Sequence, residues 1–204
     1  MANYLSVNQK YSSFNSQLAK TENNDCFVRA LAVAGETDYQ TAHQVAKEVF
    51  GRKEKKGTAN FMISTMFLKA ETAGMYLGNK KLEVAVLGRR DIKNKYKVKG
   101  EEIWRQKTLK SFIESHPVGN YIVTVAGHAL AVIDGELADW SKEGFKPTRK
   151  VQAAYRVHPQ QITSQLSLWP KDVISKSIMN CLADKRSIQN YCDEYGFGKV
   201  EMSK

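Results

Sequence analysis

The sequence predicts an α+β fold, because helical patterns come first in the chain and strand patterns follow them. Helical patterns occupy most of the range 25–74, whereas short apolar runs of strand type recur over the range 82–158. Helices followed by a run of strands are typical of α+β proteins, here with N-terminal helices packed on an antiparallel sheet. The chain has 204 residues, 42% of them hydrophobic and 25% charged, which is ordinary usage for a globular protein.

The N-terminal part of the chain predicts an arm followed by three helices. Residues 1–20 are polar and are expected to pack on the domain as an arm. The letters "NND" are a helix start signal, and "CFVRALAVA" continues them as a helix over residues 25–34, with Asp25 expected as its N-cap or as a partner of its dipole. Two further helices are expected over residues 38–52 and 60–74.

The second half of the chain predicts the strands. "LEVAVL" over residues 82–87 is the first expected strand, and "TLKSFIESHP" over residues 108–117 is a short helix that stops before its proline. The run "GNYIVTVAG", a hairpin after it and "KVQAAYRVH" over residues 150–158 complete an antiparallel sheet.

The stretch "GHALAVIDGELADW", residues 127–140, predicts a β-hairpin. Its Asp-Gly pair at 134–135 is the dipeptide that a two-residue type I′ turn prefers, because both central residues need a positive φ. Counting back from that turn places Leu130 opposite Asp139, and His128 shares the face of Leu130. His128 and Asp139 would then be diagonal neighbours, about 7–8 Å apart by backbone position.

Cys26 is the candidate nucleophile that such a His–carboxylate pair requires. It is expected in the first turn of the helix over residues 25–34, where the helix dipole stabilises a thiolate. A cysteine at a helix N-terminus, paired in space with a histidine on a strand, is the arrangement that nucleophilic cysteine catalysis needs. The alternative interpretation is that Cys26 is a small buried hydrophobic residue.

The order of these residues resembles the papain-like cysteine peptidase superfamily. The motifs "NDCFVRALA" and "GHALAVIDGELADW" are similar in particular to small cysteine-peptidase-like proteins of bacteriophages and bacteria, over residues 15–140. Members of the family place a tryptophan near the third catalytic residue, and here Trp140 follows Asp139. The resemblance implies a papain-like fold and a catalytic triad in which Cys26 attacks, His128 acts as base and Asp139 orients His128.

The oxyanion hole is the point at which the sequence departs from this family. Papain uses a glutamine six residues before its cysteine, and the residue at that position here is Lys20. The backbone N–H of Cys26 is expected to provide one donor. The side-chain candidates for the second donor are Asn24, Asn23 and Gln17.

A change of composition after Pro159 predicts two parts in the chain. Residues 1–158 would form the papain-like hydrolase domain, and residues 159–204 would form a C-terminal helical extension. The segment "KDVISKSIMNCLADK" carries one apolar stripe at helical spacing, which suits either a small appendage or a docking element.

The formal net charge of +10 is concentrated between residues 80 and 110, where eleven Lys or Arg and four Asp or Glu leave +7. The alternation of lysines with Tyr96 and Val98 indicates a solvated β-ribbon or an extended loop. One interpretation is a surface for nucleic acid or an acidic partner; the other is a charged hairpin whose lysines protect an edge strand. The candidate binding residues are Arg89, Arg90, Lys93 and Lys95.

Several classes of protein find no support in the sequence. No run of 18 apolar residues is present, and the N-terminus lacks the features of a signal peptide. Three cysteines do not suggest a disulfide framework, and Cys181 and Cys192 lack zinc-ligand spacing. Without zinc, P-loop or dinucleotide motifs, no metal or cofactor is expected. The expected compartment is a reducing cytoplasm, which for a phage protein would be that of the host, or else the virion.

Two functions from different classes follow. The first is a thiol hydrolase that cleaves or transfers a peptide, isopeptide or side-chain amide of a protein or peptide substrate. The second is a non-catalytic papain-like protein that binds nucleic acid or a host protein through its basic segment 80–110.

Overall fold

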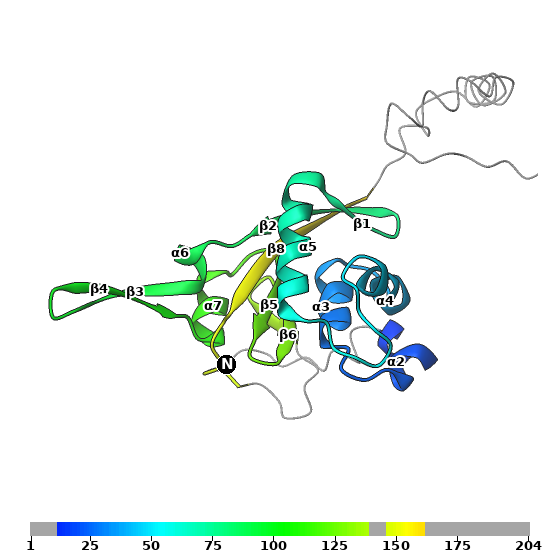
Figure 1. The fold of residues 1–204 in the computed structure, drawn as a ribbon, viewed down its shortest axis with the longest axis horizontal. Helices are drawn as coiled ribbons and strands as arrows, with labels where there is room; N and C mark the ends of the chain where they lie inside the picture. The colour runs from blue at the N-terminus through cyan, green and yellow to red at the C-terminus, as the bar shows by residue number, and fades with distance from the viewer. Residues whose placement is uncertain (1–11, 139–145, 162–204) are drawn as a thin grey trace, which may run out of the picture. The chain divides into compact units, whose positions relative to one another are not determined.

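An antiparallel sheet of six strands forms the centre of the computed structural model, which describes residues 12–138 and 146–161 (Figure 1). The α+β class predicted from the sequence is therefore confirmed. In sheet order the strands are β1 (Met75–Leu77), β2 (Lys80–Val86), β8 (Ala153–Gln161), β5 (Asn120–Val125), β6 (His128–Ile133) and β7 (Glu136–Ala138).

The last strand in the sequence, β8, lies inside the sheet between β2 and β5. It continues through Pro159 to Gln161, whereas the sequence predicted a strand that ends at 158. Pro159 lies opposite Leu82 of β2, beyond the point where the pairing of β8 with β5 has ended. A proline is tolerated there because its missing N–H falls on the open side of the strand. The compact unit that holds the described residues runs to Gln161, and the expected extension lies outside the described residues from 162 on.

The three helices expected in the first half of the chain are present, and α4 is shorter than predicted. It ends at Glu48 instead of 52, because the chain then turns through Gly51, at φ +63°, and buries Phe50. Phe50 packs against Phe27 and Phe67 with ring centroids 4.7 and 5.2 Å apart. The helices are η1 (Ser12–Asn15), α2 (Gln17–Thr21), α3 (Cys26–Ala34), α4 (Tyr39–Glu48), α5 (Asn60–Ala73), α6 (Arg89–Ile92) and α7 (Leu109–Ser115).

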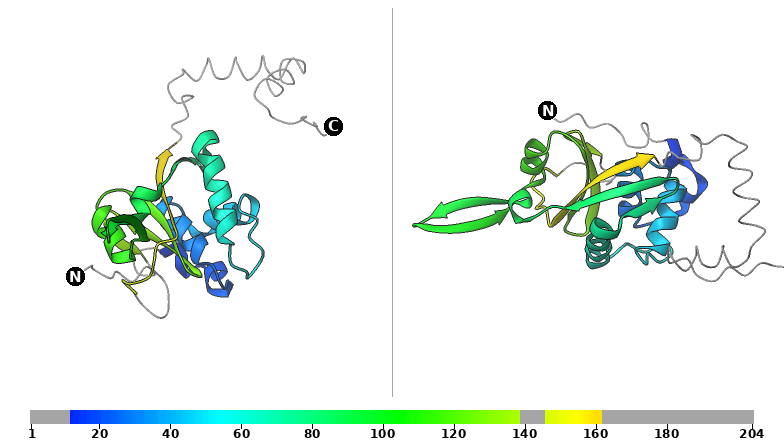
Figure 2. Two further views of the ribbon diagram at one scale, coloured as in Figure 1. Left: turned by 60° about the vertical axis from the view of Figure 1, so that its left-hand side comes forward. Right: turned by 90° about the horizontal axis from the view of Figure 1, so that it is seen from above.

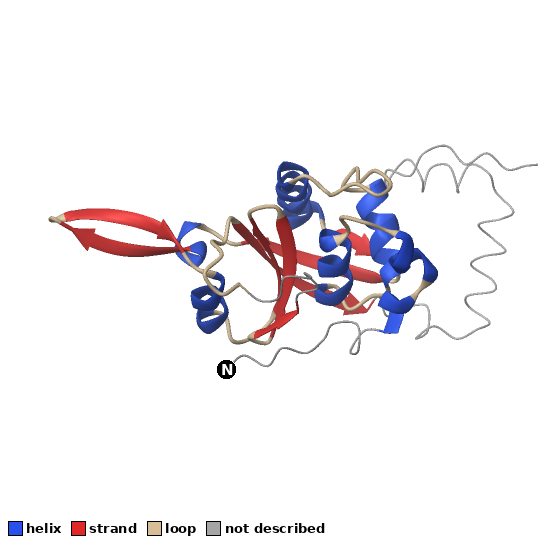
Figure 3. Cartoon of the chain, turned by 90° about the horizontal axis from the view of Figure 1, so that it is seen from below, coloured by secondary structure: helices blue, strands red, loops and turns tan. Residues whose placement is uncertain are grey.

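Helices cover both faces of the sheet and define two clusters of buried side chains (Figure 3). The larger cluster joins α3, α4 and α5 to one face, and the smaller joins α7 to the other. Strand β6 takes part in both, because side chains alternate along a strand. Ala129 and Ala131 belong to the cluster of α3, whereas Leu130 and Val132 belong to that of α7.

The hairpin β6–β7 has the predicted register. Ala131 pairs with Ala138, and the pairing continues to the turn at 134–135. Asp134 and Gly135 have φ values of +47° and +75°, as a type I′ turn requires. The next expected pair, Leu130 with Asp139, reaches beyond the described residues, as does Trp140.

The basic segment forms a separate two-stranded ribbon, which is the first of the two structures, β-ribbon or extended loop, that the sequence indicated. Strands β3 (Lys93–Val98) and β4 (Glu101–Gln106) pair only with each other among the described strands. In Figures 1 and 2 the ribbon extends away from the six-stranded sheet, with α6 at its base.

Candidate active site

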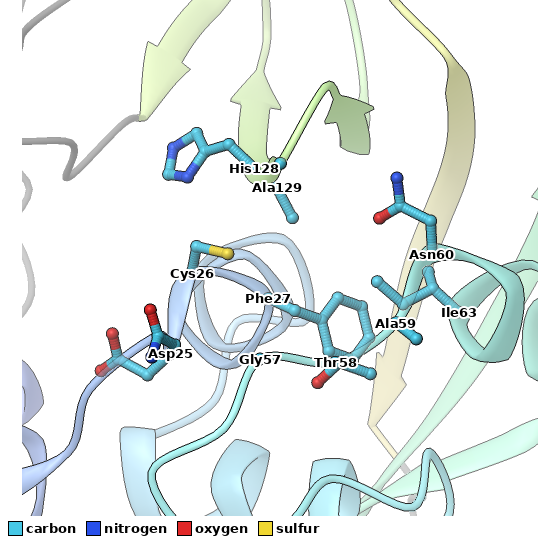
Figure 4. Close-up of a pocket in the computed structure, with 12 residues that line it drawn as sticks. Asp25, Cys26, Phe27, Gly57, Thr58, Ala59, Asn60, Ile63, His128 and Ala129 are labelled. Atoms are coloured by element: carbon cyan, nitrogen blue, oxygen red, sulfur yellow. The ribbon is translucent and has the colours of Figure 1, made fainter.

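A pocket of about 730 Å³ lies at the N-terminal end of α3 (Figure 4). Its size falls within the range of about 300–1,000 Å³ that is usual for ligand sites. Three segments that are far apart in the sequence line it: residues 24–27, the stretch 57–60 together with Ile63 of α5, and residues 127–129. The pocket therefore has both Cys26 and His128 in its lining, as the sequence analysis anticipated for the two residues.

Cys26 is the first residue of α3, and its free thiol is half-buried in the pocket wall. Neither a backbone nor a side-chain acceptor receives the N–H of Cys26 within the described part of the chain. The first N–H groups of a helix have no intrahelical acceptor, and they carry the positive end of the helix dipole. The N–H of Cys26 is thus available to stabilise negative charge next to its own sulfur.

Asp25 occupies the N-cap position of α3, but its side chain does not cap the helix as the sequence predicted. Its Oδ2 instead accepts hydrogen bonds from Arg29 Nε at 2.9 Å and from the Tyr39 hydroxyl at 2.7 Å. Burial and the bond to Asp25 raise the pKa of Tyr39 far above its usual range, so Tyr39 acts as a donor. Arg29, one turn on in α3, and Tyr39 of α4 thus hold the carboxylate in place of the backbone N–H groups of the first turn.

His128 is the first residue of β6, directly after Gly127 at φ +68°. Helix α3 packs against β6, and this contact brings Cys26 to the end of the strand where His128 lies. Alternation points Ala129 toward α3 and predicts the opposite face for His128, yet His128, at the end of the strand, belongs to the lining of the pocket. Figure 4 draws both side chains at the same pocket, with the ring of His128 above Cys26 in this view and the Cys26 sulfur pointing to one side of it.

Of the three side chains considered for the oxyanion hole, Asn24 lines the pocket, and Asn23 and Gln17 do not within the described residues. Asn24 has φ +53°, and its Nδ2 donates to the carbonyl of Lys55 at 3.3 Å. An amide nitrogen carries two hydrogens, so one remains for a second acceptor. Lys20, at the position of papain's glutamine, is exposed on α2.

A buried ion pair between Glu22 and Arg52 fastens one wall of the pocket. Arg52 Nη2 donates to Glu22 Oε2 at 2.8 Å and to the carbonyl of Asn23 at 3.1 Å. The backbone N–H of Lys55 donates to the same carboxylate at 3.2 Å. These bonds tie the loop after α4 to the segment that precedes Cys26, so two lining segments of the pocket are held together.

The charge of Glu22 is maintained despite its burial. Burial raises the pKa of this carboxyl, but the hydrogen bonds and charges of Arg52 and His43 outweigh burial and hold the pKa below its usual 4.5. His43 Nε2 lies 3.1 Å from Glu22 Oε1 and 3.0 Å from Arg52 Nη1. No sequence motif marks Glu22 or Arg52, and the mid-helix position of His43 suggested a surface residue, because these three side chains meet only in the folded chain.

Thr58 is a further polar residue in the lining of the pocket. Its Oγ1 is buried and has no hydrogen-bond partner within the described structure, although the residue lines the pocket. A buried hydroxyl without a partner costs free energy that a bound molecule could recover by hydrogen bonding. Thr58 is therefore a further polar feature of the pocket that sequence patterns did not reveal.

The four basic residues proposed for binding lie outside the pocket lining. Arg89 and Arg90 belong to α6, and Lys93 and Lys95 belong to β3. The candidate catalytic residues and the candidate basic surface are thus carried by different parts of the fold.

Comparisons with protein-family models, with curated proteins and with solved structures gave no match to this chain. Among the described residues, no group of three or more His, Cys, Asp or Glu side chains is placed to hold a metal ion. No helix in the same part of the chain has the length and apolar character needed to cross a membrane. The site must therefore be interpreted from its own geometry.

Proposed function

We propose that this protein is a papain-like thiol hydrolase that acts on an amide bond of a protein or peptide. The observation that carries the proposal is one pocket whose lining includes both Cys26, at a helix N-terminus without a side-chain cap, and His128. A helix that carries the cysteine and packs on an antiparallel sheet that carries the histidine supports the papain-like assignment. We keep Asp139 as the proposed acid that orients His128, because the register of the β6–β7 hairpin supports its predicted position.

In the proposed reaction, the thiolate of Cys26 attacks the carbonyl carbon of the scissile amide. His128 holds the proton taken from the thiol and transfers it to the leaving nitrogen as the C–N bond breaks. The oxygen of the tetrahedral intermediate accepts hydrogen bonds from the N–H of Cys26 and the amide of Asn24. Water, deprotonated by His128, then cleaves the thioester, releases the acid and restores the thiol.

The same apparatus serves peptide bonds, isopeptide bonds and side-chain amides. If an amine replaces water in the second step, the reaction is acyl transfer. A reducing compartment such as the cytoplasm, that of the host in the case of a phage protein, keeps the thiol in its reduced form.

The test is thiol alkylation of the full chain with iodoacetamide, read out by mass spectrometry at each cysteine. We expect Cys26 to react faster than Cys181 and Cys192, and its rate to fall at least tenfold in His128→Ala, because the imidazole no longer takes the proton. Cleavage of a quenched peptide library should be lost in Cys26→Ala and retained in the matched control Cys181→Ala. Thermal melts of Cys26→Ala should match those of the parent chain, since this side chain is half-buried at the pocket.

Equal alkylation rates at Cys26 in the parent chain and in His128→Ala would show that the two side chains do not act together. Hydrolysis that survives in Cys26→Ala would refute the nucleophile assignment. If the parent chain itself shows no hydrolysis, the second candidate function, a non-catalytic binding protein, is favoured, because the basic ribbon gives it a surface for a partner.

A further inference from the structure

The β3–β4 ribbon is an unusual feature of this fold because none of its residues is buried. Every residue of β3 and β4 is half-buried or exposed. Its six paired positions give an arm about 20 Å long, at about 3.4 Å per residue. An isolated two-stranded hairpin is at best marginally stable in water, so the ribbon depends on its side-chain pairs and on its attachment to the sheet domain.

The two faces of the ribbon differ in chemistry. Opposite residues share a face, so Lys95 lies with Trp104, and Tyr96 lies with Ile103. The first face carries the three lysines of β3 and is extended at the base by Arg89, whose guanidinium lies 4.7 Å from the centre of the Trp104 ring. The lysines of this face are Lys93, Lys95 and Lys97.

The positive charge of the lysine face is only partly compensated. Lys95 forms an ion pair with Glu102. In the portion of the chain that the structure describes, no carboxylate forms an ion pair with Lys93, Lys97 or Lys99. Successive lysines on one face are about 7 Å apart along the strand, so their mutual repulsion is unfavourable until an anion lies against them.

A nucleic acid fits this surface better than an acidic protein does. Lysine is depleted at protein–protein interfaces, whereas contacts of Lys and Arg with phosphates supply most of the affinity for nucleic acids. A two-stranded ribbon also has the width that the major groove of a duplex admits. Tyr96 is 46% exposed, with Arg105 at 5.9 Å from its ring centre, and such a ring can stack on an unpaired base.

We propose that the β3–β4 ribbon is an arm that binds the phosphodiester backbone of nucleic acid through Lys93, Lys95 and Lys97. This activity is separate from the proposed hydrolase reaction and uses none of the pocket residues. The lysines contact phosphates as point charges, so the binding depends on charge and salt rather than on sequence.

The test measures binding of the full-length chain to a fluorescent 25-base-pair duplex, and to one of its single strands, by anisotropy between 50 and 200 mM salt. The ribbon variant changes Lys93, Lys95 and Lys97 to Gln. The matched control changes Lys47, Lys53 and Lys69, three exposed lysines outside the ribbon, to Gln. The logarithm of the binding constant falls as the logarithm of the salt concentration rises, by about 0.9 for each phosphate contact. We expect the ribbon variant to make this negative slope on the duplex shallower by about 2 to 3. The control variant should leave the slope unchanged.

If the chain binds the duplex more tightly than the single strand, the arm lies in a groove of the duplex. If it binds the single strand more tightly, Tyr96 stacks on unpaired bases. Tyr96→Ala separates the two, because it should weaken only single-strand binding. An equal loss of salt dependence in both lysine variants, or the absence of binding at 50 mM salt, would overturn the proposal and favour a solvated charged hairpin whose lysines protect an edge strand. Cys26→Ala should bind as the parent chain does, which keeps this result independent of the hydrolase test.

Discussion

Asp25 shows how the neighbour of a candidate nucleophile can affect chemistry without touching a substrate. An unpaired carboxylate next to a thiol opposes formation of a thiolate, because like charges repel. Here the guanidinium of Arg29 balances the charge of Asp25, and the Tyr39 hydroxyl holds the same oxygen. Arg29 is itself held between Phe14 and Tyr39, at 5.2 and 5.5 Å from their ring centres. The result is a helix N-terminus whose donors remain available for an anion.

Glu22→Gln should destabilise the fold by about 3 kcal/mol at pH 7, since it leaves the guanidinium of Arg52 buried beside a neutral group. The folded pKa of Glu22 lies below 4.5, so its contribution is complete above that pH and is lost as the pH falls through the lowered value. The difference between Glu22→Gln and the parent chain should therefore shrink below pH 4.5. Urea unfolding at pH 7 and pH 3 measures both quantities.

The control for this prediction is Glu114→Gln. Glu114 and Lys110 form an exposed pair, with side chains 63% and 69% accessible. Exposed pairs contribute little, so this change should alter the free energy of unfolding by less than about 1 kcal/mol. A similar loss in both variants would show that burial of the Glu22–Arg52 pair does not decide its effect.

At the scale of elements, the β6–β7 hairpin is fixed by two residues of its turn. Asp134 reinforces the turn, because its Oδ1 accepts from the N–H of Gly119 at 2.8 Å and its own N–H donates to the carbonyl of Gly119 at 3.0 Å. This contact ties the turn to the start of β5. The hairpin register, which the proposed position of Asp139 depends on, thus has support from both local and neighbouring backbone.

Gly135→Ala should destabilise the fold by more than Gly127→Ala. Both glycines have positive φ, +75° and +68°, which costs an alanine about 1–2 kcal/mol. A Cβ at Gly135 would also lie 3.3 Å from Pro117 Cα, whereas a Cβ at Gly127 would meet nothing within 4 Å. Thermal melts of the two variants test the comparison. An equal decrease in melting temperature would mean that the backbone near Pro117 moves to admit the methyl group with no loss of stability.

At the scale of the whole molecule, β8 connects the two halves of the sheet. It pairs with β2, which follows the helices, and with β5, which precedes the hairpin of His128. The two clusters of buried side chains therefore meet across it, through Tyr155 on one face and Ala154 on the other. The start of β8 supports the wall of the pocket that carries His128, since Ala153 pairs with Thr124 of β5, which pairs in turn with Ala129 of β6.

Two truncated chains, one ending at Gln161 and one ending at His158, test the role of the final residues of β8. The shorter chain loses three pairs with β2, from Leu82 with Pro159 to Lys80 with Gln161. We expect it to melt at least about 3 °C lower, since 1 kcal/mol corresponds to about 2–4 °C in a domain of this size. Equal melting temperatures would show that the strand is complete at residue 158, as the composition of the sequence suggested.

Local sequence signals were sufficient for the elements that carry the candidate site. Helix α3 begins at Cys26, directly after the start signal "NND", and the hairpin of His128 has the register that a type I′ turn at Asp134 and Gly135 predicts. Both signals act over a few residues. They can therefore be recognised in the sequence before the rest of the fold is known.

Only the tertiary structure decided how those elements combine. It placed β8 between β2 and β5, turned the Asp25 carboxylate from the helix cap to Arg29, and closed the pocket wall with Glu22 and Arg52. It also separated the basic ribbon from the pocket, which the charge count could not do. The physical reason is that these contacts join residues up to about 80 positions apart, as Lys80 and Gln161 are, and their free energy comes from burial and pairing that exist only once the sheet has formed.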